Sequence, residues 1–292
     1  MRDYVILSDS CCDLDKKMRE LYGIEFVYMY VHFKGSEQIA DLDWQEYSQK
    51  EFYDELRAGV ICKTAQVSIE NYQQAFEDCI NRGLDVLSIS TSSGLSGSVN
   101  ASFIARDFVL AKYPDAKIIC IDSLISSLGL GRVLVDAARL QAKGKTIYEV
   151  ARYVEDERLY YWQVGSVESL KYLKRAGRVT GMTAFMGNLL GIKPIIISNI
   201  KGENLSVEKV KGRKNSIRRC VEMTKENIID ASNQSVFVVH ADCLEEAIDI
   251  KAMLLEQVKC ADVYINDVGP ILGASCGPGM FGIYFKGKKR EV

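Results

Sequence analysis

The stretch that decides the fold is Ser88-Ile89-Ser90-Thr91-Ser92-Ser93-Gly94-Leu95-Ser96-Gly97-Ser98, which leaves an apolar strand and enters a helix. Residues 85–89 are typical of a short buried strand, and apolar side chains at helical spacing begin after Gly97. The first turn of a helix presents unpaired N–H groups and the positive end of the helix dipole. Small hydroxyl residues there predict a site for a carboxylate or a phosphate. Serine and threonine also cap helices and fill turns, so a purely structural turn is the alternative.

Two further apolar strands end in an Asp-Ser pair. Residues 4–7 run into Ser8-Asp9-Ser10, and residues 117–121 run into Asp122-Ser123. Apolar strands separated by helices predict a parallel sheet that is covered on both faces. Ligands of such sheets bind beyond the carboxyl ends of the strands, so we expect these polar ends to gather around residues 90–96.

The alternation of strands and helices becomes irregular after residue 160. Residues 193–197 and 205–210 predict a hairpin, helices are expected at residues 183–190 and 215–231, and residues 268–279 are expected to form a rigid glycine-rich loop. We therefore predict an α/β protein of two domains. Residues 1–160 form an N-terminal, Rossmann-like domain with a parallel sheet, and residues 161–292 form a C-terminal α/β domain with a mixed sheet.

Composition excludes several classes of partner. The chain has 292 residues, 48% of them hydrophobic, and a net charge of −2, which gives no electrostatic reason to expect nucleic acid. Its nine cysteines and two histidines show no zinc-binding or disulfide pattern, which indicates reduced thiols and no metal site. No apolar run is long enough for a signal peptide or a membrane span, so we predict a cytoplasmic protein.

The catalytic patterns in the sequence are incomplete. Residues 273–277 match the Gly-x-Ser-x-Gly pattern of a hydrolase, but Pro278 interrupts the helix which that motif needs, and the last histidine, His240, lies upstream. Hydroxyl groups without a general base can hold an anion but activate a nucleophile poorly. The sequence thus favours a binding protein with no catalytic residue and no cofactor. The alternative is a small-molecule hydrolase that uses Ser96 or Ser275.

Taken together, the motifs resemble the DegV family of bacterial fatty-acid-binding proteins. The matching segments follow the family's order over essentially the whole chain: Ser8-Asp9-Ser10, Lys63-Thr64-Ala65-Gln66-Val67-Ser68, Ser92-Ser93-Gly94-Leu95-Ser96-Gly97, Ile121-Asp122-Ser123, Leu170-Lys171-Tyr172-Leu173-Lys174-Arg175-Ala176-Gly177-Arg178, Lys193-Pro194, Gly269-Pro270 and Gly277-Pro278-Gly279. Each motif alone is weak, whereas the ordered series is specific.

The resemblance implies that one long-chain fatty acid lies in a tunnel between the two domains. It implies that the hydroxyls of Thr64 and Ser96 bind the carboxylate, and that the protein presents it to a separate ATP-dependent fatty acid kinase, which makes acyl phosphate for phospholipid synthesis. Arg178 and Arg213 match family arginines near the head group or on the surface that faces the kinase. The remaining positions expected at the ligand are Ser93, Gly94, Leu95, Gly97, Ser275 and Cys276.

Two departures from the family pattern concern the expected head-group site. The family usually has Thr-Ser-Gln-Pro where this chain has Thr64-Ala65-Gln66-Val67, and it usually has a histidine near the position of Ser275. The second change removes a possible positive partner for the carboxylate. A regulatory module that binds a protein through the surface around Arg178 and Arg213 is a further interpretation, compatible with lipid binding.

Overall fold

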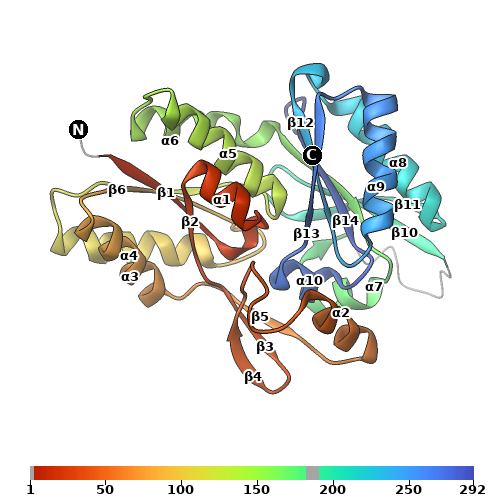
Figure 1. Cartoon of the computed structure of the whole chain (residues 1–292), viewed down its shortest axis with the longest axis horizontal. Helices are drawn as coiled ribbons and strands as arrows, with labels where there is room; N and C mark the ends of the chain where they lie inside the picture. The colour runs from red at the N-terminus through yellow and green to blue at the C-terminus, as the bar shows by residue number, and fades with distance from the viewer. Residues whose placement is uncertain (1–2, 182–190) are drawn as a thin grey trace.

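The structure is a computed structural model that describes residues 3–181 and 191–292 (Figure 1). The helix predicted at residues 183–190 lies outside these residues. The first part of the chain contains a four-stranded parallel sheet in the order β2-β1-β6-β7, as predicted. Its strands are β1 (Tyr4–Asp9), β2 (Ile24–Val27), β6 (Asp85–Ser90) and β7 (Ile118–Asp122).

Helices cover both faces of this sheet (Figure 1). On one face lie α3 (Ile69–Asn81) and α4 (Ser98–Lys112); on the other lie α1 (Lys16–Tyr22), α5 (Leu128–Ala142) and α6 (Ile147–Glu157). Side-chain caps fix where several of them begin. Ser68 accepts a hydrogen bond from Asn71 N, and Thr146 forms a capping box with Glu149.

The sequence of residues 24–31 predicts a single strand, and this prediction is wrong, because two strands of different sheets occupy the region. β2 pairs with β1, whereas β3 (Tyr30–Phe33) pairs with β4 (Ser36–Ile39) and with β5 (Lys63–Ala65). The chain leaves the parallel sheet at Met29, whose N–H donates to Ser10 Oγ at 2.9 Å. The small antiparallel sheet β4-β3-β5 carries Thr64, and α2 (Gln49–Ala58) follows β4 along the chain.

The later part of the chain forms a seven-stranded mixed sheet in the order β13-β12-β14-β8-β10-β11-β9. The predicted hairpin is confirmed as the antiparallel pair β10–β11. The last strand along the chain, β14, lies inside the sheet, between β12 and β8. The strands are β8 (Tyr161–Ser166), β9 (Val179–Thr180), β10 (Ile192–Ser198), β11 (Asn204–Lys211), β12 (Ser235–His240), β13 (Asp262–Asp267) and β14 (Phe281–Lys286).

The helices of this part include α7 (Leu170–Ala176), α8 (Arg213–Asn227) and α9 (Leu244–Met253), which a π-helical turn at Leu254–Val258 extends. Single 3₁₀ turns lie at Ser10–Cys12, Arg158–Tyr160 and Ala231–Asn233. The predicted domain boundary falls immediately before β8. One cluster of buried apolar side chains contains residues from both sides of this boundary, so the division into two domains stays a prediction.

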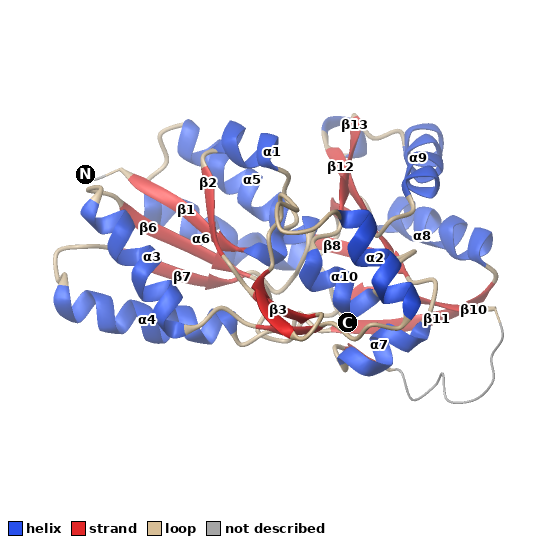
Figure 2. Ribbon diagram, turned by 60° about the horizontal axis from the view of Figure 1, so that its bottom comes forward, coloured by secondary structure: helices blue, strands red, loops and turns tan. Residues whose placement is uncertain are grey.

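The glycine-rich loop expected at residues 268–279 is wrong, since its middle forms the helix α10 (Pro270–Cys276). Pro270 stands in the first turn of the helix, where a backbone N–H has no acceptor within the helix, so the missing N–H of proline costs no hydrogen bond. Gly273 fits inside because a Cβ there would lie 2.8 Å from Tyr53 Oη. Figure 2 shows α10 beside α2, β3 and α7, so it joins the late part of the chain to the small sheet.

Candidate functional site

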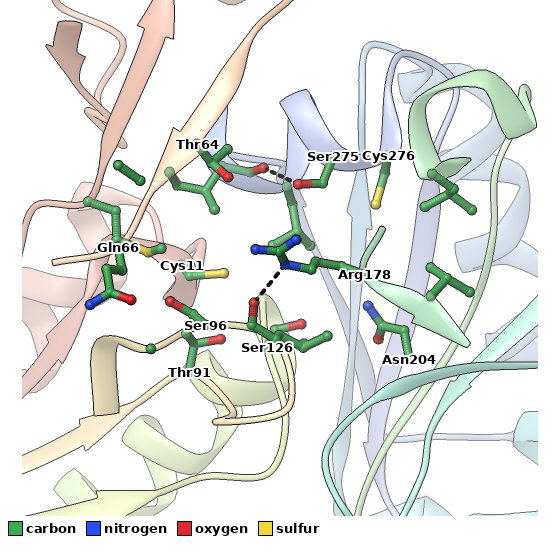
Figure 3. Close-up of a pocket in the computed structure, with 18 residues that line it drawn as sticks. Cys11, Thr64, Gln66, Thr91, Ser96, Ser126, Arg178, Asn204, Ser275 and Cys276 are labelled. Atoms are coloured by element: carbon green, nitrogen blue, oxygen red, sulfur yellow. Dashed lines mark hydrogen bonds between the residues drawn. The ribbon is translucent and has the colours of Figure 1, made fainter. Parts of the chain in front are cut away.

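A cavity of about 320 Å³ lies where the small sheet, α10 and the turn between β6 and α4 meet (Figure 3). We call this turn, residues 91–97, the hydroxyl-rich turn. Segments far apart in the sequence contribute its walls. Thr64 comes from β5, Ser96 from the turn after β6, Arg178 from the segment after α7, and Ser275 and Cys276 from the end of α10. The structure therefore brings together the two hydroxyl residues, the arginine and the α10 residues that the sequence singles out.

The polar strand ends gather as predicted and fix the turn that carries Ser96. Asp9 at the end of β1 accepts a hydrogen bond from Thr91 N at 2.8 Å, and Asp122 at the end of β7 accepts one from Ser93 N at 3.2 Å. Burial raises the pKa of Asp9 to about 6, although the N–H groups of Thr91 and Cys11 oppose that shift. These two carboxylates therefore hold the turn in place through hydrogen bonds to its backbone N–H groups.

The Ser96 hydroxyl is prepared to donate into the cavity. Ser96 Oγ accepts a hydrogen bond from Ser98 N at 3.2 Å and lies 3.0 Å from Ser98 Oγ. Ser98 is fully buried, and its Oγ accepts from Val67 N, so its own hydrogen has to point to Ser96. The hydrogen of the Ser96 hydroxyl is then left for a ligand acceptor.

Thr64 is held by its backbone and offers a free hydroxyl. It lies opposite Val31 in the β3–β5 pair, and none of the described residues forms a hydrogen bond with its side chain. Figure 3 shows Thr64 and Ser96 on opposite sides of the cavity. A threonine with an unused hydroxyl at a cavity wall can bind a ligand without any rearrangement of the protein.

The other turn residues divide into two groups. Leu95 and Gly97 line the cavity, whereas Ser93 and Gly94 do not. Gly94 faces the turn between β10 and β11, where a Cβ would lie 3.0 Å from Glu203 Cγ. Gly97 allows a similarly close approach, because a Cβ there would lie only 2.0 Å from Gln66 Oε1. Two of the four residues therefore shape the turn without lining the cavity.

Ser275 and Cys276 line the cavity from α10, but neither side chain is activated as a nucleophile. Ser275 Oγ donates to Ile271 O at 3.0 Å, one turn earlier in the helix. Burial raises the pKa of the Cys276 thiol to about 12, which keeps it protonated and unreactive. Neither described histidine lines the cavity: His32 lies on β3, and His240 Nε2 lies 3.2 Å from Asp267. The site thus holds serine hydroxyls without a general base.

Arg178 brings positive charge to the cavity. Its Nε donates to Leu95 O at 3.3 Å and its Nη1 to Ala176 O at 2.9 Å, which leaves the guanidinium beside the hydroxyl turn (Figure 3). None of the described residues forms an ion pair with it. An adjoining hollow of about 440 Å³ shares Thr64, Arg178 and Ser275 with the cavity and adds Lys63 and Arg175. The outer side of the site is therefore basic and suits an anion.

Arg213 lies away from the cavity, and two of its three guanidinium nitrogens are bonded inside the protein, whereas Nη1 is buried without a partner among the described residues. Its Nε donates to Glu246 Oε1 at 3.0 Å, its Nη2 donates to Gly279 O at 2.6 Å, and its guanidinium lies 4.8 Å from the centre of the Phe281 ring. Only 15% of the side chain is exposed. In this structure Arg213 ties α8 to α9 and to the start of β14.

The cavity continues inward into a narrow extension of about 20 Å³. The two share Leu173, Val179, Leu272 and Cys276, and the extension adds further apolar side chains, namely Val167, Ile196, Met280 and Phe281. A hydroxyl-rich, basic outer part followed by an apolar inner part matches the two ends of an amphiphile. The arrangement suits an acid with a long alkyl chain.

Sequence reasoning missed four polar residues of the cavity wall, and one of them, Gln66, belongs to a segment that matches the family. Thr91 and Ser126 line the cavity, and Asn204 lines both the cavity and its extension. Thr91 and Ser126 follow the strands β6 and β7, so the pattern of polar strand ends contained a signal for them. Asn204 begins β11 in the second sheet, and no motif marks it.

Other types of site find no support in residues 3–181 and 191–292. Within these ranges no helix combines the length and the apolar character that a membrane span requires. The same residues contain no cluster of three or more side chains that could ligate a metal ion.

Comparison with known proteins agrees with this geometry. The sequence profile described as "Uncharacterised protein, DegV family" matches residues 3–288. A DegV domain-containing protein of Clostridium perfringens is 34% identical over 100% of both chains, and one of Clostridium acetobutylicum is 31% identical over 97% of this chain and 98% of its own.

Solved structures show the same fold. DegV of Bacillus subtilis, named a fatty acid binding protein, is 28% identical with a TM-score of 0.85, over 99% of this chain and 100% of its own. A DegV lipid binding protein of Thermotoga maritima is 26% identical with a TM-score of 0.86, over 99% and 100%. The profile match over nearly the whole chain and the relatives above 30% identity lead to one conclusion: the chain belongs to the DegV family.

Proposed function

We propose that this protein binds a long-chain fatty acid, with its carboxylate at Thr64 and Ser96 and its alkyl chain directed toward the inner extension. The observation that carries the proposal is the polarity of the cavity, whose hydroxyl-lined, basic outer part leads into an apolar interior. Relatives named as fatty acid binding proteins support it, because they share the fold over almost the whole chain.

The two parts of the ligand contribute different kinds of free energy. Each buried methylene contributes about 0.8 kcal/mol, so the alkyl chain provides most of the affinity. The hydroxyls and Arg178 then fix where the carboxylate lies. Neutral donors such as Thr64 and Ser96 hold an anion without a buried counter-charge, whereas Arg178 adds charge-assisted attraction from the exposed side.

The proposal includes a partner but no chemistry by this chain. A carboxylate held near the basic hollow of Lys63, Arg175 and Arg178 would be available to a separate ATP-dependent fatty acid kinase in the cytoplasm, which would convert it to acyl phosphate. In this proposal Ser275 is a wall residue and not a nucleophile, because its hydroxyl is bonded within α10 and the described histidines lie elsewhere.

Ligand extraction tests the proposal. Protein purified from a bacterial host should show an added mass in native mass spectrometry, and organic extraction should release a long-chain fatty acid. Delipidated protein should take up added fatty acid with one-to-one stoichiometry. Protein that is uniformly empty and also fails to take up long-chain fatty acids would overturn the proposal. Turnover of chromogenic esters that is lost in Ser275→Ala would favour the hydrolase instead.

A further inference from the structure

A pair of amide side chains interrupts the apolar inner extension. Gln163 on β8 and Asn204 at the start of β11 both line it, and Gln163 Nε2 donates to Asn204 Oδ1 at 2.9 Å. Gln163 is only 6% exposed, and its Oε1 is buried without a hydrogen-bond partner among the described residues. The head-group site does not use this pair.

An unpaired amide oxygen is costly at this place. The neighbouring wall residues Val167, Ile196, Met280 and Phe281 offer no polar side-chain atom, and an unsubstituted alkyl chain could not offer one either. Ser166 also lines the extension, but its hydroxyl donates to Pro194 O at 2.7 Å. Buried polar atoms in folded proteins almost always have a hydrogen-bond partner, so Gln163 Oε1 needs a donor from outside the described residues. A ligand group or a water molecule has to supply the missing hydrogen bond.

The pair leaves one acceptor and several N–H hydrogens open, because each amide nitrogen carries two hydrogens. In the present orientation the open acceptor is Gln163 Oε1, and none of the described residues accepts a hydrogen bond from Asn204 Nδ2. Rotating both amides by half a turn makes Asn204 Oδ1 the open acceptor and again leaves N–H hydrogens open on both residues. A hydroxyl group both donates and accepts, so it fits either orientation. A carbonyl or an alkyl group does not.

We propose that Gln163 and Asn204 form a polar site at the inner extension of the cavity that binds a hydroxyl group on the acyl chain, so that this protein prefers hydroxylated fatty acids. The inference rests on the proposed function and adds a ligand class to it. The Ser126 hydroxyl, which also lines the cavity and its extension, provides a further polar atom on the path of the chain. The competing occupant is water, since a cavity of about 20 Å³ has room for one molecule.

Competition between matched acids tests this inference. Delipidated protein is titrated with octadecanoic acid and with a series of octadecanoic acids that carry one hydroxyl at successive positions along the chain. One position should bind about tenfold more tightly than the unsubstituted acid, the effect of one hydrogen bond to an otherwise unpaired buried group. Equal or weaker binding of every hydroxylated acid would overturn the inference and would indicate water at the pair.

Three variants assign the preference to the amides. Gln163→Met and Asn204→Leu remove the open groups at similar side-chain length and should abolish the preference. Leu272→Met changes an apolar wall residue of the same extension and should retain it. A preference that survives in both amide variants would overturn the assignment. If neither acid binds to the wild-type protein, the proposed function itself fails; if both bind equally, only the hydroxyl site fails.

Discussion

The guanidinium of Arg178 donates a hydrogen bond from Nε to the main-chain carbonyl of Leu95, 3.3 Å away. This contact joins the segment after α7 to the turn that carries Ser96, although 83 positions separate the two residues. It brings a positive charge to a group of neutral hydroxyls. The head-group site is therefore assembled by tertiary contact, and its parts can be tested separately.

Removal of the two hydroxyls should weaken fatty acid binding and leave the fold intact. Thr64→Val and Ser96→Ala should each raise the Kd for a long-chain fatty acid about tenfold, because each removes one hydrogen bond to the carboxylate. Thr64→Val should leave the thermal midpoint unchanged, since no described residue bonds to the Thr64 side chain. Isothermal titration and thermal unfolding measure both quantities.

Ser68→Ala is the matched control for these hydroxyl variants. Ser68 caps α3 by accepting a hydrogen bond from Asn71 N at 3.1 Å, so its loss should lower the free energy of unfolding by about 1 kcal/mol. Its Kd should stay at the wild-type value. An unchanged Kd in the Thr64 and Ser96 double variant would refute the assigned head-group position.

Replacement of Arg178 should make binding weaker and less sensitive to salt. Arg178→Gln removes a charge that no described carboxylate neutralises, so the Kd should rise several-fold at low ionic strength, and the difference should shrink in high salt. Arg152→Gln is the control, because Arg152 lies on α6 and, within residues 3–181 and 191–292, forms an ion pair only with Asp156. Equal salt dependence of the wild type and Arg178→Gln would show that the arginine does not contact the head group.

The buried carboxyl of Asp13 should make stability fall with rising pH. Burial raises the pKa of Asp13 to about 7, and hydrogen bonds from Ser127 Oγ and Gly269 N offset part of that shift. Because the unfolded value is about 3.9, the folded state binds more protons between about pH 4 and pH 7, and stability decreases across this window as pH rises.

Asp13→Asn removes this titration while its amide can still bond to both partners. Urea unfolding at a series of pH values should therefore give a shallower decline for the variant than for the wild type. Parallel curves for the two proteins would mean that Asp13 titrates alike in the folded and unfolded states.

Gly202→Ala should destabilise the protein through two separate effects. Gly202 has φ of +74°, and an added Cβ would lie 2.0 Å from Ser92 Oγ and 2.8 Å from Leu124 Cα. Gly144 has a similar φ of +80° with nothing within 4 Å, so Gly144→Ala measures the backbone effect alone, about 1 kcal/mol. Chemical unfolding should show a larger loss for Gly202→Ala. Equal losses of unfolding free energy would mean that the β10–β11 hairpin does not pack closely against the hydroxyl-rich turn.

Much of the fold was predictable because its signals are local. The apolar strands of the parallel sheet and the serine and threonine caps follow from neighbouring residues alone, as Ser68 and Thr146 show. The helix α10 was mispredicted because its glycines indicate a loop. Only the contact with Tyr53, which is more than two hundred positions away, explains why Gly273 suits a buried helix.

The cavity was less predictable than the fold. The sequence singles out Thr64, Ser96 and Arg178, and all three line the same cavity. Asn204 and Gln163 escaped notice because single amides in strands carry no pattern. Their meaning depends on which strands the tertiary fold places beside the cavity.

The position of β14 inside the seven-stranded sheet has a consequence for biosynthesis. Its partners β8 and β12 emerge from the ribosome earlier, and neither can complete its hydrogen bonding until Phe281–Lys286 has been translated. Until then, two strand edges that end up inside the sheet are exposed as sites for mispairing. A premature stop codon before residue 281 would therefore yield an aggregation-prone fragment and not a weakened binder.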